Sequence, residues 1–405
     1  MKEIQLDEVF EFIRNGASIK QADGKGGYPI SRIETIWNKT IDTKRLGYAD
    51  IGDEQLKDYE KYLMKEGDIL MTHINSPKHL GKCAVYIGDP KTLIHGMNLL
   101  CMRANQQITI PTYIKYFFNS KFFKVQLPKI SNQSVNQASF SAGNLKKLKI
   151  PLPPLDQQKK IAAILDAADA YRQKTKALIE KYDELTQSLF LDMFGDPVRN
   201  PMGWEKVVFG NFITVLTDYH SNGSYETLSK HVTLKNEPDF SLMVRTTDLE
   251  KNNFIDGVKY IDEHAYNHLS KSKIYGGEII MNKIGSAGKV YKMPKLNRPV
   301  SLGMNAFLLR FNDSINQIFL YFQLTSKYGE REIQKRVKGA VTKTIRKDAV
   351  REIPIVSPPL ELQNQFADRV QAIEAQKAQA QASLAQAEDL FNSLLQRAFK
   401  GELTN

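Results

Sequence analysis

The feature that most constrains this chain is a proline-rich turn followed by a long apolar repeat, and it occurs twice. The first copy opens with Ile150-Pro151-Leu152-Pro153-Pro154-Leu155 and runs to Phe194-Gly195, and the second opens at Ile353-Pro354 and runs through Pro358-Pro359-Leu360 to Phe399-Lys400-Gly401. Proline is accepted in the first turn of a helix, and glycine just past the end suits a left-handed cap. We therefore predict two long helices of equal length, each roughly 60 Å long at 1.5 Å per residue.

Both predicted helices carry apolar residues at heptad spacing. We expect these residues to pair the helices or to dock a partner: Ile161, Leu165, Ala168, Leu178, Tyr182 and Leu189 in the first, and Phe366, Val370, Ile373, Leu384, Phe391 and Leu394 in the second. A second row is expected to widen the stripe of the first helix: Ile164, Tyr171, Leu178 and Leu185. Heptads sustained without proline favour a coiled coil. Two long helices packed on separate cores remain the alternative.

The blocks that precede the two helices also repeat each other. Three short segments return at offsets of 207 to 210: Gly67-Asp68-Ile69-Leu70-Met71 as Gly277-Glu278-Ile279-Ile280-Met281, Gly81-Lys82 as Gly288-Lys289, and Gly96-Met97-Asn98 as Gly303-Met304-Asn305. We predict an α+β fold with two α/β domains in tandem, each followed by a long helix, over residues 1–154, 155–196, 197–359 and 360–405. Antiparallel pairing of the helices would give pseudo-two-fold symmetry, which suits a target with two half-sites at a fixed distance.

Within the first block, alternation and turn residues predict the local elements. We expect a short amphipathic helix over Leu6–Arg14 and an aromatic-rich helix over Tyr113–Phe123. Buried strands are expected at Ile69–Met71, Cys83–Ile87 and Leu99–Met102.

The charge of the chain is concentrated on the two blocks. The net charge is +11, and the two long helices together carry −3, so that about +14 falls on the rest. This indicates a polyanionic partner for the blocks, for which we favour double-stranded DNA. A mild basic excess without any nucleic-acid role is the alternative. The two cysteines support no disulfide framework, and no signal peptide or long apolar stretch is present, so we expect a cytoplasmic protein without membrane contact.

Candidate DNA-binding side chains lie in the expected loops of both blocks. They are residues that bond base edges and phosphates: Arg32, His73, Asn75, Lys78, Lys82, Gln133, Asn136 and Gln137 in the first block, and Arg245, Lys283, Ser286, Lys289, Lys343 and Arg346 in the second. The two sets differ in identity although the scaffold repeats. We therefore expect the two half-sites to differ.

The catalytic and metal-binding patterns in the sequence are incomplete. Asp42-Thr43-Lys44 has the Asp-x-Lys of metal nucleases without the upstream Pro-Asp, and Glu263-His264 with His268 lacks an evident third ligand. Gly285-Ser286-Ala287-Gly288-Lys289 fits neither dinucleotide nor P-loop spacing. We predict no catalytic residue, no metal and no bound cofactor. A self-contained DNA-modifying enzyme and a coiled-coil scaffold protein remain as alternatives.

With these features in place, the chain resembles the specificity subunits of type I restriction-modification systems. The resemblance rests on the proline turn followed by Asp156-Gln157-Gln158, on Met193-Phe194-Gly195-Asp196-Pro197, and on the second set from Ile353 to Gln363 with Phe399 to Leu403. It covers the whole chain. The recognition blocks vary widely in this family, so that the resemblance assigns no base contact.

The resemblance implies that each block is a target-recognition domain for one half of a bipartite DNA sequence. The paired helices would set the gap and dock two modification (methyltransferase) subunits, with restriction subunits in the larger complex. This chain would be non-catalytic. S-adenosylmethionine, ATP and Mg²⁺ would belong to the partner subunits.

Overall fold

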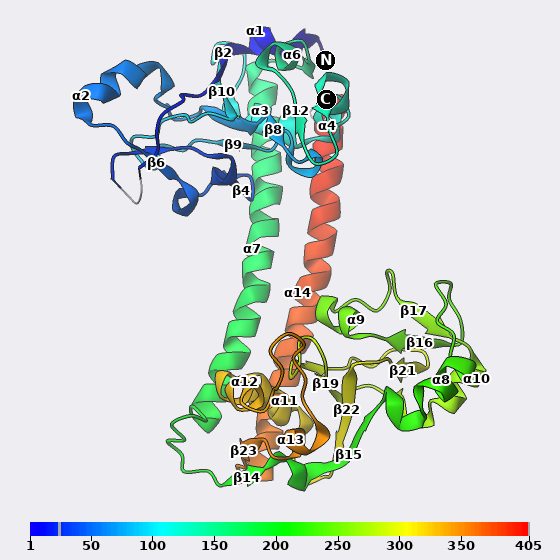
Figure 1. Ribbon diagram of the computed structural model, residues 1–405. Helices are drawn as coiled ribbons and strands as arrows, with labels where there is room; N and C mark the ends of the chain where they lie inside the picture. Colours follow the sequence, from blue (N-terminus) through cyan, green and yellow to red (C-terminus); the bar gives the residue numbers. More distant parts are fainter. Residues whose placement is uncertain (23–25, 404–405) are drawn as a thin grey trace. The chain divides into compact units, whose positions relative to one another are not determined.

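The computed structural model describes residues 1–22 and 26–403, and the chain divides into two compact units. Unit 1 comprises Met1–Ala177 and Gln381–Asn405, and unit 2 comprises Leu178–Ala380. Each unit contains one globular block and parts of both long helices, α7 (Leu155–Phe194) and α14 (Leu360–Lys400) (Figure 1). In the part of the chain that the structure describes, no helix is both long and apolar enough to span a membrane.

The two long helices pack against each other in opposite directions. In unit 1 the start of α7 shares a core with the end of α14, through Ile161 and Leu165 on one helix and Phe391 and Leu395 on the other. In unit 2 the end of α7 shares a core with the start of α14, and Lys377 of α14 bonds Asp183 of α7. The predicted antiparallel pair is confirmed, and both helices begin directly after a proline pair.

The central sheet of unit 1 is a four-stranded antiparallel sheet. Its strand order is β2 (Phe10–Asn15), β10 (Leu99–Ala104), β7 (Ile69–Thr72) and β9 (Cys83–Val85). The smaller strand groups are β1 (Glu3–Gln5) with β13 (Lys149–Pro151), β3 (Tyr28–Ile30) with β6 (Gly47–Ala49), β4 (Ile36–Trp37) with β5 (Thr40–Ile41), and β11 (Asn132–Gln133) with β12 (Ala138–Ser139) and β8 (Ile74–Asn75). The short helices are α1 (Leu6–Val9), α2 (Asp53–Leu56), α3 (Pro111–Asn119), α4 (Lys121–Lys124), α5 (Leu127–Ile130) and α6 (Ala142–Lys146).

Unit 2 contains a sheet of the same order and a further sheet. The first is β15 (Ile213–Asp218), β22 (Ala306–Phe311), β19 (Ile279–Asn282) and β20 (Val290–Lys292), and β14 (Lys206–Val208) pairs with β23 (Pro354–Val356). The further sheet is β17 (Lys259–Ile261), β16 (Ser241–Val244), β21 (Val300–Leu302) and β18 (Lys273–Ile274). The short helices are α8 (Tyr225–His231), α9 (Thr246–Lys251), α10 (Glu263–His268), α11 (Gln317–Thr325), α12 (Lys327–Gln334) and α13 (Lys347–Arg351).

The internal repeat seen in the sequence holds at the level of single contacts. Arg103 donates to buried Asp68 at 2.8 and 2.7 Å in unit 1, and Arg310 donates to buried Glu278 at 3.1 Å in unit 2. Asn98 and Asn305, which match in sequence, have φ of 73° and 71°. A left-handed backbone at matching non-glycine positions is uncommon, so it marks one scaffold used twice.

The signature glutamine of each proline turn has a structural role. Gln158 and Gln363 are buried, and each donates from Nε2 to the carbonyl oxygen of a turn proline, Pro153 or Pro358, at 2.8 Å. The Oε1 of Gln158 accepts from Ile110 N at 3.2 Å, and that of Gln363 accepts from Asn316 N at 2.9 Å. These bonds fasten the start of each long helix to the helix of its own block, α3 or α11.

Three local predictions for the first block need correction. The segment Leu6–Arg14 is not one helix, because α1 ends at Val9 and the alternating residues after it pair with β10. The predicted helix Tyr113–Phe123 is interrupted at Ser120, whose hydroxyl caps a new helix by accepting from Phe123 N. The strand expected over Cys83–Ile87 is shorter than predicted, since β9 ends at Val85.

Candidate nucleic-acid interface

In unit 1, most of the candidate DNA-binding residues gather around the three-stranded sheet β11–β12–β8. Gln133 pairs with Ala138, which pairs with Asn75, so that these three residues form one row across the sheet. Between β11 and β12 the chain makes a hairpin loop, Ser134 to Gln137, closed by Ser134 N donating to Gln137 O at 2.7 Å. Gln133, Asn136 and Gln137 are exposed. The structure therefore brings the amide side chains together on one hairpin.

The remaining candidates of this cluster differ in their accessibility. Lys78 and Lys82 are exposed on the turn that follows β8. His73 is buried, with its ring edge-on to Phe140, and burial lowers its pKa. The imidazole of His73 is thus neutral at pH 7 and packs as a core side chain rather than as a basic contact.

Arg32 lies apart from the hairpin, at a pocket of about 270 Å³ in unit 1. Glu34, Met97 and Asn98 line the same pocket. The Arg32 Nη1 is 3.9 Å from Glu34 Oε1, and its Nε is buried without a hydrogen-bond partner within the described ranges 1–22 and 26–403. A guanidinium so weakly paired retains donors for a ligand.

Unit 2 has a corresponding hairpin between residues 338 and 344. Lys338 and Thr344 exchange both backbone hydrogen bonds at 2.8 and 2.7 Å, and Thr344 also forms a bridge to Ile284. Ile345 N donates to Lys283 O, just as Phe140 N donates to His73 O in unit 1. Lys343 on this hairpin and Arg346 after it are exposed. Lys343 thus lies on the hairpin that corresponds to the amide-bearing hairpin of unit 1, and Arg346 follows that hairpin at the start of α13.

Lys283 is held by a buried carboxylate that the sequence did not suggest as a partner. Its Nζ is 2.7 Å from Asp218 Oδ2, and Lys347 Nζ is 3.6 Å from the other oxygen. Burial alone would raise the Asp218 pKa, but hydrogen bonds from Lys283 and Ser221 and the two lysine charges outweigh it and lower that pKa. Lys283 is therefore largely neutralised within the fold.

The other three candidates of unit 2 lie close to the same region but are engaged to different degrees. Arg245 donates to Asp248 at 3.0 and 2.6 Å and to the Gly257 carbonyl oxygen at 2.8 Å, so most of its donors are occupied. The hydrogen bond and charge of Asp248 raise the pKa of Arg245. Ser286 donates to Glu250 at 2.6 Å. Lys289 is exposed and lies near the Tyr291 ring.

The two weak catalytic patterns have structural explanations. Asp42 accepts from Lys44 N and from Arg45 Nε, so it caps a short 3-10 turn. Near His264 and His268 the structure adds a third imidazole, His231, whose Nδ1 is 3.0 Å from His264 Nε2. The His268 ring stacks flat on His231 instead of facing a shared point. Among the described residues, no group of histidines, cysteines or carboxylates is arranged to hold a metal ion.

The predicted helix-pairing residues separate into two faces. Of those named, the ones buried or half-buried are Ile161, Leu165, Ala168, Tyr182, Leu189, Phe366, Val370, Ile373, Leu384, Phe391 and Leu394. Leu178 is instead exposed, together with Ile164, Tyr171 and Leu185. The prediction that this second row widens the buried stripe was therefore wrong, because all four of its side chains are exposed on α7.

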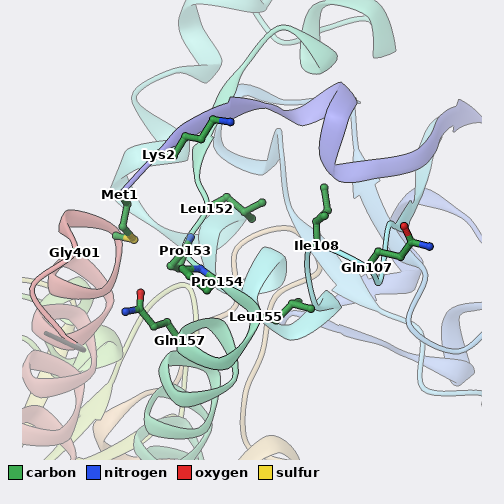
Figure 2. Close-up of a pocket in the computed structure, with 10 residues that line it drawn as sticks. All are labelled: Met1, Lys2, Gln107, Ile108, Leu152, Pro153, Pro154, Leu155, Gln157 and Gly401. Carbon is green, nitrogen blue, oxygen red and sulfur yellow. The ribbon is translucent and has the colours of Figure 1, made fainter.

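A pocket of about 710 Å³ lies in unit 1 beside the first proline turn (Figure 2). Leu152, Pro153 and Pro154 line it from the turn, together with Met1 and with Gly401, the residue that follows α14. Its walls carry no cluster of basic or catalytic side chains. It is a feature of the helix junction, separate from the hairpin cluster.

Comparison with known proteins identifies a family with this architecture. The model of the type I restriction modification DNA specificity domain matches residues 1–182 and again 202–388. A specificity subunit of the type I restriction enzyme MjaX from Methanocaldococcus jannaschii is 32% identical over 387 residues, covering 91% of this chain and 86% of the relative. The MjaVIII specificity subunit of the same organism is 23% identical and covers 92% and 88%.

Solved structures agree at the level of the fold. The S subunit of a type I restriction-modification system from M. genitalium superposes with a TM-score of 0.58 at 16% identity, covering 98% of this chain and 96% of that one. The repeated domain match and the long alignment to the M. jannaschii relative decide the assignment. The chain belongs to the family of type I restriction-modification DNA specificity proteins, with two copies of the specificity domain in tandem.

Proposed function

We propose that this chain is the DNA sequence-specificity subunit of a type I restriction-modification complex, in which each globular block recognises one half of a bipartite target. One observation carries the proposal: each unit has a hairpin held to the segment after its central strand by a corresponding backbone hydrogen bond, Phe140 N to His73 O or Ile345 N to Lys283 O, and the side chains on the two hairpins differ. A repeated scaffold with unlike polar loops suits two unlike half-sites.

The candidate residues divide between base contact and phosphate contact. The exposed amides Gln133, Asn136 and Gln137 have the paired donor and acceptor that reads a base edge, above all adenine. Positive charge for phosphate contact comes from Lys78, Lys82, Lys289 and Lys343. The guanidinium of Arg346 can donate two parallel hydrogen bonds to O6 and N7 of guanine. Arg245 and Lys283 are assigned to the scaffold, because carboxylates already occupy their donors.

The long helices serve assembly in this proposal. Their buried row pairs α7 with α14, and the exposed row on α7, with Ile164 and Tyr171 in unit 1 and Leu178 and Leu185 in unit 2, remains for a partner. Apolar residues repeated every seven positions on an exposed helix face suit docking of another helix. We assign this row to the modification subunits.

The chain itself is non-catalytic in this proposal. Methyl transfer from S-adenosylmethionine to adenine, and ATP- and Mg²⁺-dependent cleavage, belong to the modification and restriction subunits. The described residues offer hydrogen-bonding and charged side chains on hairpins, which bind DNA, and the catalytic patterns in the sequence are capping and stacking contacts.

Adenine-methylation mapping tests the proposal directly. Genomic DNA is compared from a host that carries the chain with its cognate modification subunits and from the same host without the chain. We expect a bipartite methylated motif that disappears with the chain. If the complex assembles and no chain-dependent motif exists, the scaffold alternative is favoured, whereas S-adenosylmethionine binding by the isolated chain would favour a self-contained enzyme.

Exchange of one block sharpens the test. Replacing residues 205–350 with the same segment of another family member leaves α7, α14 and unit 1's hairpin in place. We expect the methylated motif to change in one half only. A change in both halves would overturn the assignment of one half-site to each block.

A further inference from the structure

Each hairpin carries a valine at its tip that the fold leaves almost completely in solvent. Val135 is 96% exposed and Val341 is 98% exposed, the highest values among the large apolar side chains of the described residues. Single exposed apolar residues are ordinary on protein surfaces. Two of them at corresponding tips, one in each unit, call for an explanation.

The backbone holds both valines in place. In unit 1 the loop is closed by Ser134, whose N and Oγ lie 2.7 and 3.0 Å from the Gln137 carbonyl oxygen. In unit 2 the ends are closed by the exchanged bonds of Lys338 and Thr344, and Gly285 N donates to Lys343 O at 3.0 Å. Each loop is therefore a braced projection that can present an apolar side chain.

The residues around the valines include polar and basic side chains that can contact DNA, and they differ between the units. The first tip reads Ser134-Val135-Asn136-Gln137 and the second Gly339-Ala340-Val341-Thr342-Lys343, without a carboxylate in either. Valine is the one large apolar residue that both tips contain. Polar neighbours that differ suit different bases, whereas a side chain common to both tips suits a task that is the same in both half-sites.

We propose that Val135 and Val341 are wedges that insert at a base step, one in each half-site, and unstack it. This inference rests on the proposed DNA-specificity function and adds the contact that deforms the duplex. A branched aliphatic side chain has no donor or acceptor with which to read a base edge. Apolar side chains inserted between base pairs unstack the duplex and bend it.

The wedge has a consequence for the chemistry of the partner. A modification enzyme has to extract its adenine from the stack before it can react with it, and that costs stacking energy. A base step already opened by Val135 or Val341 lowers this cost near the target. Flexible pyrimidine–purine steps would accept the wedge most readily.

The test uses the full chain assembled with its modification subunits, bound to the target found by methylation mapping. Fluorescent base analogues such as 2-aminopurine replace single bases through both half-sites. We expect one step in each half-site to brighten several-fold on binding. Val135→Ser should abolish the signal in one half-site only, and Val341→Ser in the other, each with about a tenfold loss of affinity.

The chain offers a matched control in Ile255, a branched aliphatic residue 81% exposed on a polar loop of unit 2. Ile255→Ser should leave affinity and fluorescence unchanged, and Val135→Ile should retain the signal that Val135→Ser loses. Binding without unstacking, or serine variants that behave as the Ile255→Ser control does, overturns the wedge alone. A wild-type complex that shows no specific binding overturns the proposed function and the wedge with it.

Discussion

Unit 1 and unit 2 are alike in the central sheet and at the start of each long helix, and they differ in the segments between the strands of that sheet. The ion pairs Arg103–Asp68 and Arg310–Glu278 and the glutamines Gln158 and Gln363 recur almost contact for contact. Along the chain between β2 and β7, unit 1 forms the small strand pairs β3–β6 and β4–β5. Between the corresponding strands β15 and β19, unit 2 forms β16, β17 and β18, three strands of its further sheet. The glutamine contacts preserve the docking of each long helix and the ion pairs preserve the central sheet, so the segments between the strands are free to change what each block recognises.

The largest effect is expected when the aromatic ring at the end of a long helix is removed, because that ring packs in the core of its unit. Phe194 packs on Phe319 and Phe366 at ring-centroid distances of 4.7 and 5.3 Å, and Phe399 packs on Tyr113 and Phe117 at 5.3 and 5.5 Å. We expect Phe194→Ala to destabilise unit 2, and Phe399→Ala unit 1, by about 3–5 kcal/mol each.

Tryptophan fluorescence during urea unfolding can follow the units separately. The chain's two tryptophans are Trp37 in unit 1 and Trp204 in unit 2, so Trp204→Phe or Trp37→Phe leaves one reporter. Equal loss in both units from either alanine variant would show that the units do not unfold independently.

The second prediction concerns acid, because the two units are expected to lose stability in different pH ranges. Burial lowers the pKa of His95 in unit 1 to about 4, from 6.5. Between these values the unfolded chain binds more protons, so unit 1 loses stability as the pH falls from 6.5 to 4, by about 3 kcal/mol in total. His73 acts in the same direction.

In unit 2, Asp218 acts only in stronger acid. Its pKa lies below the ordinary 3.8, so its stabilisation is present above pH 3.8 and is lost as the pH falls further. The more accessible His268 has a lowered pKa too, from partial burial and the neighbouring charges of His231 and His264, and contributes less than buried His95. Urea midpoints between pH 7 and 4.5 should fall more for the Trp37 reporter, and His95→Gln should flatten that fall; a steeper fall for Trp204 would contradict this.

A smaller effect distinguishes the matching glycines Gly81 and Gly288. Both have positive φ, and an added Cβ would lie 2.7 Å from Leu127 Cδ1 at Gly81 but 2.3 Å from Ile333 Cγ2 at Gly288. A leucine tip can move aside, whereas the methyl of a β-branched isoleucine is held at χ1. We expect alanine to cost about 2–3 kcal/mol at Gly288, less at Gly81 and about 1 kcal/mol at Gly203, where φ is +68° and no atom lies within 4 Å. Thermal or urea unfolding gives the order, and a Gly203→Ala loss as large as that of Gly288→Ala would refute the steric explanation.

The smallest effect is expected from the ion pairs between α7 and α14. Lys176 and Glu388 of unit 1 are 3.1 Å apart and each side chain is 44% exposed, while Lys377 of unit 2 is more buried against Asp183. Double-mutant cycles should give about 0.3–0.5 kcal/mol for the first pair and slightly more for the second, both reduced by salt. Coupling above about 1 kcal/mol in the first pair would mean that charge helps to align the helices.

Much of the scaffold could be predicted because its signals are local or repeated. Proline pairs, heptads and terminal glycines mark α7 and α14, and the glycines after them have φ of +74° at Gly195 and +82° at Gly401. The segment Leu6–Arg14 was mistaken for a helix because its second half alternates and is decided by pairing with β10. The exposure of Leu178 could not be foreseen, since two heptad rows on one helix look alike until a partner covers one.

The candidate interface was predicted less completely for a different reason. Residue type identified the hairpin amides and lysines, which need only be exposed. Whether a cation is free depends on contacts far along the chain: Asp218, 65 residues before Lys283, neutralises it, and nothing in the sequence links the two. Arg245 had its partner three residues away in Asp248, a capping arrangement that the local sequence does contain.

The division of the chain into units bears on the order in which it can fold on the ribosome. Unit 2 is one continuous segment, Leu178–Ala380, whereas the core of unit 1 needs Phe391, Leu395 and Phe399 from the last part of α14. The block that is synthesised first therefore lacks part of its own core until nearly the whole chain has been translated. Vectorial folding would complete the second block before the first, and nascent unit 1 would keep an apolar face exposed for most of synthesis.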